Sequence, residues 1–220
     1  MRIDLWSDVI CPWCYLGARR LELATKDHPR ATEVELYFHS YELDPNAPAE
    51  DDRPMTELIS TKYGISPGEA AASQAHLEQL AAEVGLEYHL DRTKRANTFD
   101  AHRLLHLARD RNLQPELARA LFAAYFTDGR AISDRAVLSE VATGAGLNPG
   151  EVEEVLCSDA YAEHVRRDEQ AAAELGATGV PFFVVGERYA ISGAQDPEFL
   201  RKVLDRAFAE TAVPKAGGSA

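Results

Sequence analysis

The sequence predicts an α/β fold in which a long run of helices interrupts a small sheet. Alternating apolar residues, the pattern of half-buried strands, occur only near the two ends of the 220-residue chain. Between residues 54 and 173 the apolar residues recur at helical spacing almost throughout. A pair of cysteines separated by two residues stands where the first predicted strand gives way to the first predicted helix. We therefore expect a discontinuous α/β domain with a helical insertion.

The first elements form a strand, a helix and a second strand. Residues 3–6 read as a strand, residues 12 to about 28 as a helix, and residues 34–39 as a strand with alternating apolar positions. Such a βαβ unit places its two strands in parallel with a right-handed crossover. We expect the cysteine pair at the carboxyl end of the first strand, where sheets of this kind usually hold their reactive groups.

The long middle segment, residues 51–173, is predicted to be an all-helical domain. Two of its helix starts are clearly marked in the sequence, at Ser66-Pro67-Gly68-Glu69 and at Asn148-Pro149-Gly150-Glu151. Each offers a capping side chain, a proline at the first helical position and an acidic residue three positions after the cap. The apolar positions of this segment are interpreted as the core of a helical bundle.

The last elements return to strands and then a helix. Phe182–Val185 and residues 188–191 flank Gly186-Glu187, a connection with glycine first that predicts a type II′ hairpin. A closing helix follows Asp196-Pro197, over residues 198–209. The order β-α-β, helical block, β-β-α is that of a thioredoxin-like fold with an inserted all-helical domain. The predicted boundaries are 1–50 and 174–212 for the thioredoxin-like domain, 51–173 for the insertion and 213–220 for a flexible tail.

The cysteine pair, Cys11 and Cys14, indicates dithiol redox chemistry. Cys11 reads as the cap of the first helix, and Pro12 as its first residue, so the partial positive charge of the helix start favours a thiolate at Cys11. We expect Cys11 at the exposed tip to attack a disulfide, and Cys14, one turn into the helix, to resolve the mixed disulfide.

Zinc binding and structural thiols are the alternatives for this pair. Tetrahedral zinc needs about four ligands, usually from a second cysteine pair or from paired histidines, and neither pattern occurs in the sequence. The third cysteine, Cys157, is expected to be a small buried apolar residue, and a regulatory thiol that pairs with Cys11 is the alternative. No metal or cofactor is predicted.

The loop before the third strand is expected to pass beside the cysteines. It contains Val180-Pro181, and we expect this peptide bond to be cis. An ordinary trans proline that opens a strand is the alternative. A proline here would leave the Val180 backbone free to pair with an extended peptide, so both residues are candidate substrate contacts.

Composition limits the partners. A net charge of −13 disfavours nucleic acids and anionic membranes as partners, because both select for basic surfaces. No apolar stretch reaches the roughly 18 residues of a membrane span, and the N-terminal residues do not resemble a signal peptide. The expected location is the cytoplasm. The oligomeric state does not follow from the sequence.

Three motifs carry a family resemblance. They are Ser7-Asp8-Val9-Ile10-Cys11-Pro12-Trp13-Cys14-Tyr15-Leu16-Gly17, Asn97-Thr98-Phe99-Asp100-Ala101-His102-Arg103-Leu104, and residues 176–184 together with Ser192-Gly193-Ala194-Gln195. In this order they resemble the DsbA family of thioredoxin-like oxidoreductases, and its cytoplasmic FrnE-like branch is the most similar part. The resemblance covers residues 3 to about 208.

The resemblance implies a protein-disulfide oxidoreductase or isomerase that acts on disulfide-containing proteins or peptides. It assigns Cys11 as nucleophile, Cys14 as resolving cysteine and Pro181 as the cis-proline. The same signatures resemble 2-hydroxychromene-2-carboxylate isomerases and kappa-type glutathione transferases, which usually carry serine where Cys11 stands. A glutathione-dependent isomerase or transferase, with glutathione as a partner, is therefore one alternative. A non-catalytic chaperone that holds peptides is the other.

Several further residues are weaker candidates. Trp13 is interpreted either as a partly exposed cover over the sulfurs or as a platform for apolar substrate side chains. By the resemblance, Asn97 and His102 face the active-site groove, where His102 could orient a substrate or hold a proton; Asn97 is equally a helix cap. Asp8 could restrain the thiolate or pass a proton to Cys14, and His39 is interpreted as a satisfied sheet-edge residue.

Overall fold

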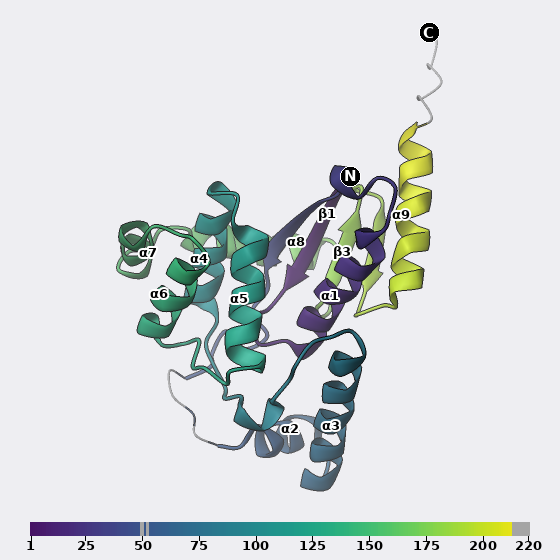
Figure 1. Cartoon of the computed structure of the whole chain (residues 1–220). Coiled ribbons are helices and arrows are strands. Elements are labelled where there is room, and N and C mark those ends of the chain that lie inside the picture. The colour runs from purple at the N-terminus through teal and green to yellow at the C-terminus, as the bar shows by residue number, and fades with distance from the viewer. Residues whose placement is uncertain (49–50, 52, 213–220) are drawn as a thin grey trace.

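A four-stranded sheet lies between two groups of helices in the computed structural model, which describes residues 1–48, 51 and 53–212 (Figure 1). The predicted tail, residues 213–220, lies outside the described residues. The strands are β1 (Arg2–Ser7), β2 (Glu35–Ser40), β3 (Phe182–Val185) and β4 (Tyr189–Ser192). Their order across the sheet is β2-β1-β3-β4, with β1 parallel to β2 and β3 antiparallel to both of its neighbours. The predicted thioredoxin-like α/β fold is confirmed.

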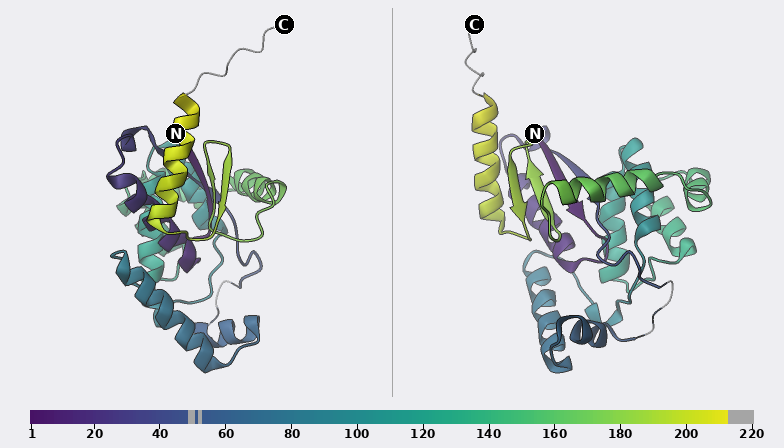
Figure 2. Two further views of the ribbon diagram at one scale, coloured as in Figure 1. Left: turned by 90° about the vertical axis from the view of Figure 1, so that its right-hand side faces the viewer. Right: turned by 180° about the vertical axis from the view of Figure 1, so that it is seen from behind.

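The two faces of the sheet are covered by different helices. Helices α1 (Pro12–Lys26) and α9 (Pro197–Ala212) lie on one face, and α8 (Ala162–Glu174) crosses the other, as the opposite views of Figure 2 show. Alternation along β1 explains this arrangement, because successive side chains point to opposite faces. Ile3 and Leu5 belong to the main apolar core, whereas Trp6 packs with Ala172 of α8 in a separate cluster.

Among the described residues, seven helices stand between β2 and β3 in the sequence. They are α2 (Met55–Tyr63), α3 (Pro67–Glu83), α4 (Phe99–Asp110), α5 (Gln114–Phe126), α6 (Arg135–Gly144), α7 (Pro149–Leu156) and α8, and short 3₁₀ turns occupy Ala31–Glu33 and Leu90–Arg92. Both predicted caps are confirmed. Ser66 and Glu69 form a reciprocal capping box at the start of α3, and the Asn148 side chain accepts hydrogen bonds from the first turn of α7.

The hairpin between β3 and β4 differs from the prediction. Gly186 and Glu187 both have a φ of +59°, and the Arg188 N–H donates to the Val185 carbonyl oxygen at 3.2 Å. Positive φ at both central residues defines a type I′ turn, so the type II′ prediction is wrong. Glycine at the first position is compatible with either turn. The type I′ turn also matches the twist of the strands, and it places Glu187 in the left-handed region.

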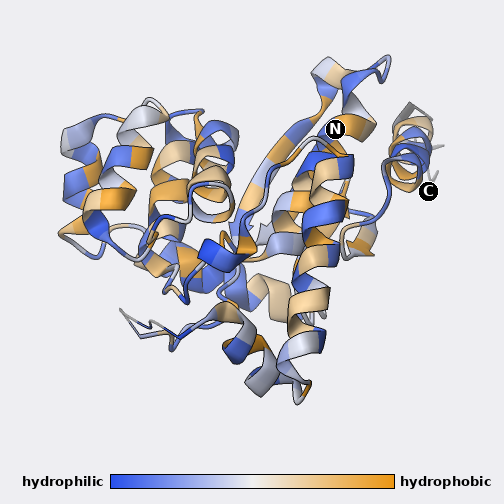
Figure 3. Cartoon of the chain, turned by 60° about the horizontal axis from the view of Figure 1, so that its bottom comes forward, coloured by the Kyte–Doolittle hydropathy of each residue, from blue (hydrophilic) through white to orange (hydrophobic). Residues whose placement is uncertain are grey.

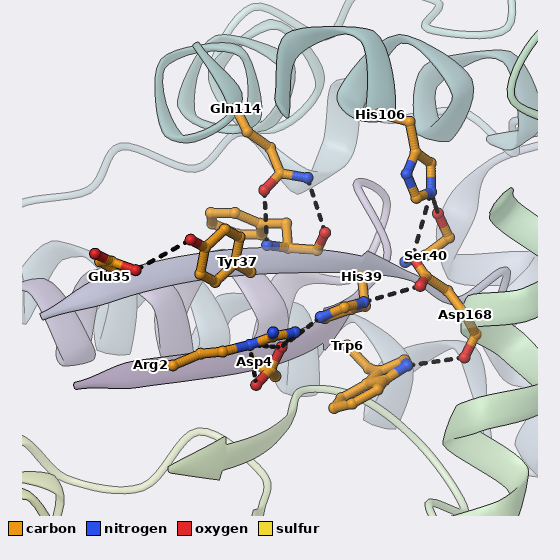
Figure 4. Close-up of polar contacts among 11 residues, drawn as sticks. Arg2, Asp4, Trp6, Glu35, Tyr37, His39, Ser40, His106, Gln114 and Asp168 are labelled. Carbon is orange, nitrogen blue, oxygen red and sulfur yellow. Dashed lines mark hydrogen bonds and ion pairs between the residues drawn. The ribbon is translucent and has the colours of Figure 1, made fainter. Parts of the chain in front are cut away.

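A buried polar network ties α8 to the sheet (Figure 4). The His39 ring lies between two carboxylates, with Nε2 2.7 Å from Asp4 Oδ1 and Nδ1 2.8 Å from Asp168 Oδ1. Asp168 also accepts the Ser40 N–H at 2.9 Å, and its backbone oxygen accepts the Trp6 indole N–H at 2.8 Å. His39 is on the edge strand β2 with both nitrogens paired, so its interpretation as a satisfied sheet-edge residue is confirmed.

Hydrophilic residues interrupt the helices along their length (Figure 3). Among the described residues, no helix has both the length and the apolar character that crossing a bilayer requires.

Candidate active site

The site begins where β1 ends and α1 starts. Cys11 is the N-cap of α1 and Pro12 its first residue, as the sequence predicts. The Cys11 N–H donates to the Asp8 carbonyl oxygen at 3.0 Å, and the Cys11 carbonyl oxygen accepts from Cys14 N–H at 3.0 Å. These bonds close the turn after β1 and the first turn of the helix. They hold both cysteines at the positive end of the α1 dipole.

Cys11 is more enclosed than predicted. The residue is 3% exposed, so the expectation of an exposed tip is wrong. Its sulfur lies 3.6 Å from the Val180 carbonyl oxygen, because the loop before β3 packs directly against the helix start. The residues around Cys11 predict the start of α1, but they do not reveal that the distant loop at Val180 covers it.

Cys14 lies fully inside the protein. It is 0% exposed, and both Cys11 and Cys14 are free thiols. Burial raises the pKa of the Cys14 thiol well above its usual range, and the neighbouring Cys11 raises it further. Hydrogen bonds from the Asp8 backbone N–H and from Ser7 lower the pKa of Cys14, but by less than burial raises it. Cys14 is therefore a protonated, shielded thiol directly behind Cys11.

The Val180–Pro181 peptide bond is cis, as predicted. Pro181 is buried, and its carbonyl oxygen accepts the Gly193 N–H at 2.8 Å, which fixes the loop at the start of the sheet. Gly17 of α1 permits the close approach of helix and loop. A Cβ at this position would lie 3.1 Å from Pro181 Cγ and 3.3 Å from Phe183 Cζ.

Tyr88 is a site neighbour that the sequence patterns do not reveal. It stands in the loop between α3 and the 3₁₀ turn at Leu90–Arg92, and its hydroxyl donates to the Pro12 carbonyl oxygen at 2.7 Å. Its ring stacks on Tyr15 and Phe126. Burial raises the pKa of Tyr88 above its usual range. Nothing in its sequence context links it to the cysteines.

Gly17 is a second site neighbour that the sequence analysis did not single out. A glycine inside a helical pattern is a signal that could have indicated close packing at this position.

Trp13 is one of the few large apolar side chains at the surface. It is 40% exposed, which suits contact with a partner molecule, whereas Pro12 is half-buried beneath the Tyr88 hydroxyl bond. Trp13 is therefore the aromatic surface that stands between the two cysteines in the sequence.

Asn97 and His102 lie in different environments. Asn97 is half-buried; its Oδ1 accepts the N–H of Phe99, the first residue of α4, at 3.1 Å, and its Nδ2 donates to the Pro45 carbonyl oxygen. His102 is 1% exposed and points inward, with Nε2 3.4 Å from Asp8 Oδ1. His102 therefore does not face an open groove, as the resemblance implied, but is buried inside the protein. Helix α4 carries it against Asp8, which stands three positions before Cys11.

Asp8 is 0% exposed. Its Oδ2 accepts the Leu43 N–H at 2.7 Å, while Oδ1 faces His102. The Asp8 backbone thus contacts both cysteines, and its side chain extends toward the inserted helices.

Cys157 is exposed at the end of α7, so its expected burial is wrong. Among the described residues, no group of three or more histidine, cysteine, aspartate or glutamate side chains is arranged to hold a metal ion.

Several solved structures have a fold similar to that of this chain. The chain is 42% identical to a probable DsbA oxidoreductase from Streptomyces coelicolor, with a TM-score of 0.93 over 99% of this chain and 94% of that one. Two others share the fold at lower identity. A 2-hydroxychromene-2-carboxylate isomerase is 17% identical, with a TM-score of 0.68 over 96% of this chain and 98% of that one. The cytosolic disulfide reductase DsbM from Pseudomonas aeruginosa, solved with GSH, is 20% identical, with a TM-score of 0.63 over the same shares.

A family model covers the two segments that build the site. It matches residues 2–205, from β1 with the cysteine pair to the cis-proline loop and most of α9, and its description is DSBA-like thioredoxin domain. The match spans both halves of the sheet and all the helices between them. The chain belongs to the DsbA-like thioredoxin domain family.

Proposed function

We propose that this protein is a thiol-disulfide oxidoreductase or isomerase that acts through Cys11 and Cys14. Cys11 is the nucleophile and Cys14 the resolving cysteine. The substrates are disulfides of proteins, peptides or small thiols. The predicted cytoplasmic location belongs to the same proposal, because a reducing compartment favours a catalytic role for such a pair.

One observation carries the proposal. The Cys11 sulfur stands at the start of α1 and faces the Val180 carbonyl oxygen at 3.6 Å, next to the cis-Pro181 bond, with Cys14 shielded behind it. A thiolate at a helix start is stabilised by the helix dipole and by free N–H groups. The difference in environment between the two sulfurs supports their different roles.

The reaction is two successive exchanges. The Cys11 thiolate attacks a substrate disulfide, forms a mixed disulfide and releases one substrate sulfur as a thiolate. Cys14 then attacks the Cys11 sulfur, which releases the second substrate thiol and leaves a Cys11–Cys14 disulfide. The substrate gains two electrons and the protein loses two. Starting from the oxidised protein, the same steps run in reverse and oxidise a dithiol substrate.

Substrate contacts are assigned to the surface around Cys11. Val180 offers its backbone beside the cis-Pro181 bond, and an extended peptide can pair with it. Trp13, with Pro12 beside it, offers an exposed aromatic face for apolar side chains. Asn97 is proposed as a further substrate contact, as predicted. His102 is buried, so no substrate contact is assigned to it.

The test is a redox titration of the Cys11–Cys14 pair against a glutathione series, read by tryptophan fluorescence. A two-electron transition that disappears in Cys11→Ser and in Cys14→Ser, but persists in Cys157→Ser, supports the proposal. No transition in the wild-type protein overturns it. Suppression of aggregation that is indifferent to both cysteines would favour the peptide-holding chaperone.

Glutathione is the second candidate partner. The structure of DsbM was solved with GSH, which supports glutathione as a partner of this fold. An isomerase or transferase that uses glutathione would bind it without electron transfer. Retained glutathione binding and isomerase activity in Cys14→Ser, without any redox transition in the wild type, would favour that alternative. Both cysteines are present here, which favours electron exchange.

A further inference from the structure

A polar hollow lies where helix α8 packs against helix α4. Its volume is about 460 Å³, within the size range of small-molecule sites, roughly 300–1,000 Å³. The lining side chains come from the last turns of α4 and from the start of α8, and every one of them carries a polar group. No residue of the proposed redox site is among them. The hollow is therefore a separate feature of the molecule.

One wall of the hollow is held in place by hydrogen bonds (Figure 4). His106 of α4 is 6% exposed, and its Nε2 lies 3.1 Å from Ser40 Oγ and 3.2 Å from Asp168 Oδ2. Asp168 is itself fixed by His39 and by the Ser40 N–H. A ligand would thus meet side chains that are already ordered, which lowers the entropic cost of binding.

Both carboxylates that line the hollow already have partners. Asp168 has the contacts just described, and Asp110 accepts the hydrogen of the Tyr161 hydroxyl, with 2.7 Å between the oxygens. Neither carboxylate forms an ion pair with an arginine among the described residues of the hollow.

The two guanidinium groups of the hollow, by contrast, lack a carboxylate. Arg109 is half-buried and lies over the Tyr37 ring at 4.8 Å, whereas Arg167 is exposed. Among the described residues, neither side chain makes an ion pair or a hydrogen bond. Arg111, which stands nearby but does not line the hollow, is paired with Glu151. The uncompensated charges of the hollow are therefore positive, in a chain whose net charge is −13.

His164 of α8 adds a hydrogen-bond donor. Burial lowers the pKa of its ring, as do Arg167 and His106, while Asp110 and Asp168 raise it by less. The ring is therefore neutral at pH 7, and a neutral imidazole offers one N–H.

We propose that this hollow binds a small hydrophilic phosphate monoester, with Arg109 and Arg167 holding its phosphate group. A guanidinium donates two parallel hydrogen bonds to one carboxylate or to one edge of a phosphate. Two guanidinium groups therefore match the charge and the three terminal oxygens of a phosphate better than those of a single carboxylate. A free phosphate ion would occupy only part of the hollow, and its polar lining suits a hydroxyl-bearing organic group in the remaining space.

The experiment is calorimetric titration of the full chain with glycerol 3-phosphate, in phosphate-free buffer at constant ionic strength. We expect saturable binding at one site. Arg109→Gln and Arg167→Gln should each weaken it at least about tenfold, because each removes charge-assisted hydrogen bonds. Binding that is unchanged in both variants overturns the proposal. Arg167 is exposed and makes no protein hydrogen bond, so its variant should unfold at the wild-type temperature when no ligand is present.

Arg111→Gln is the matched control. Arg111 follows the last residue of α4, so the substitution removes the same charge close to the hollow but outside it. We expect this variant to bind glycerol 3-phosphate within about twofold of the wild type, because exposed charges are screened by salt. A loss equal to that of Arg167→Gln would mean that only general positive charge matters, and it would overturn the proposed site.

Inorganic phosphate and succinate distinguish the possible ligands. Both should bind more weakly than glycerol 3-phosphate. Equal or tighter binding of inorganic phosphate would identify the free ion as the ligand, and tighter binding of succinate would identify a dicarboxylate; either result overturns the ester. No saturable binding of any of the three probes overturns the site itself. Cys11→Ser should bind as the wild type does, so this result is independent of the proposed redox function.

The His164 ring reports where the probe binds. An anion beside an imidazole favours its protonated form, so glycerol 3-phosphate should raise the pKa of His164. Proton NMR of the ring measures this, with His164→Gln to assign the resonance. His76, at an exposed position of α3, should titrate alike with and without the probe. A probe that binds but leaves the His164 titration unchanged lies elsewhere, which overturns the proposal.

Discussion

The Cys11 sulfur and the Val180 carbonyl oxygen lie 3.6 Å apart although 169 positions separate them in the chain. The contact joins the start of α1, which carries the proposed nucleophile, to the loop proposed to offer its backbone to a substrate. A substrate disulfide paired with Val180 would therefore reach Cys11 before it could reach Cys14.

Cys14→Ser should accumulate a mixed disulfide through Cys11, because the first exchange remains and the resolving thiol is gone. Cys11→Ser should accumulate none. Mass spectrometry of each variant after incubation with oxidised glutathione measures this. A Cys11→Ser protein that carries glutathione on Cys14 would contradict the assigned order of attack.

Cys14 should be the slowest of the three cysteines to react with an alkylating reagent in the folded protein. It is 0% exposed and burial raises its thiol pKa, whereas Cys157 is exposed. We expect Cys14 to be labelled at least about tenfold more slowly than Cys157 at neutral pH, since only the thiolate reacts. The three rates should converge in denaturant. Equal rates for Cys14 and Cys157 in the native protein would contradict its shielded position.

Gly17→Ala should slow the redox reaction and destabilise the fold. In an open helical position this change gains about 1 kcal/mol of helix propensity. Here the added Cβ would meet Pro181 Cγ at 3.1 Å and push the loop from the helix start. Gly144→Ala is the control, because a Cβ at that helical position meets nothing within 4 Å. Denaturant unfolding and the redox assay should separate the two variants; a stabilised, fully active Gly17→Ala would contradict the close packing.

Stability should fall as the pH rises above neutral because of His39. Burial lowers the pKa of His39, but hydrogen bonds to Asp168 and Asp4 outweigh it and leave the pKa raised. A group with a raised pKa contributes its full stability below its unfolded value, about 6.5, and loses it as the pH rises through its folded value. The pKa of Asp168 and that of Asp4 are lowered, so their contributions are lost only in acid.

His39→Gln tests this assignment. We expect a loss of about 3 kcal/mol in the free energy of unfolding, because Asp4 and Asp168 lose their shared cation. The decline of stability above neutral pH should flatten as well. His76→Gln, at an exposed position of α3, should leave both unchanged. If stability declined equally with rising pH in His39→Gln and in the wild type, the stabilising role of His39 between Asp4 and Asp168 would be contradicted.

Local rules made the fold predictable from the sequence. The start of α1 at Pro12, the capping box at Ser66 and the cap at Asn148 follow from single residues in fixed positions. The prediction of a cis bond before Pro181 came from the predicted topology, and the prediction of the fold class came from the order of the strands and helices. At each of these helix starts a few neighbouring residues decide the outcome.

Contacts between distant segments set the limits of prediction. The enclosure of Cys11 depends on the loop at Val180, and the hydroxyl of Tyr88 reaches Pro12 from a loop 76 positions away. His102 was a predicted site residue, but its inward position depends on how α4 packs against Asp8. The type I′ turn needs a left-handed Glu187, which residue preference alone disfavours.

The ion pair between Asp168 and His39 limits how such a protein could be shortened. Residues 51–173 look removable in a diagram of the sheet, because β2 and β3 could be joined directly. That deletion would remove Asp168 and His102 together, so His39 would keep Asp4 but lose its second carboxylate, and the Asp8 carboxylate would lose the imidazole ring that faces it. The inserted helices therefore supply polar partners to the buried groups of the domain that they interrupt, and a minimal version would need new partners or apolar residues at these positions before it could fold.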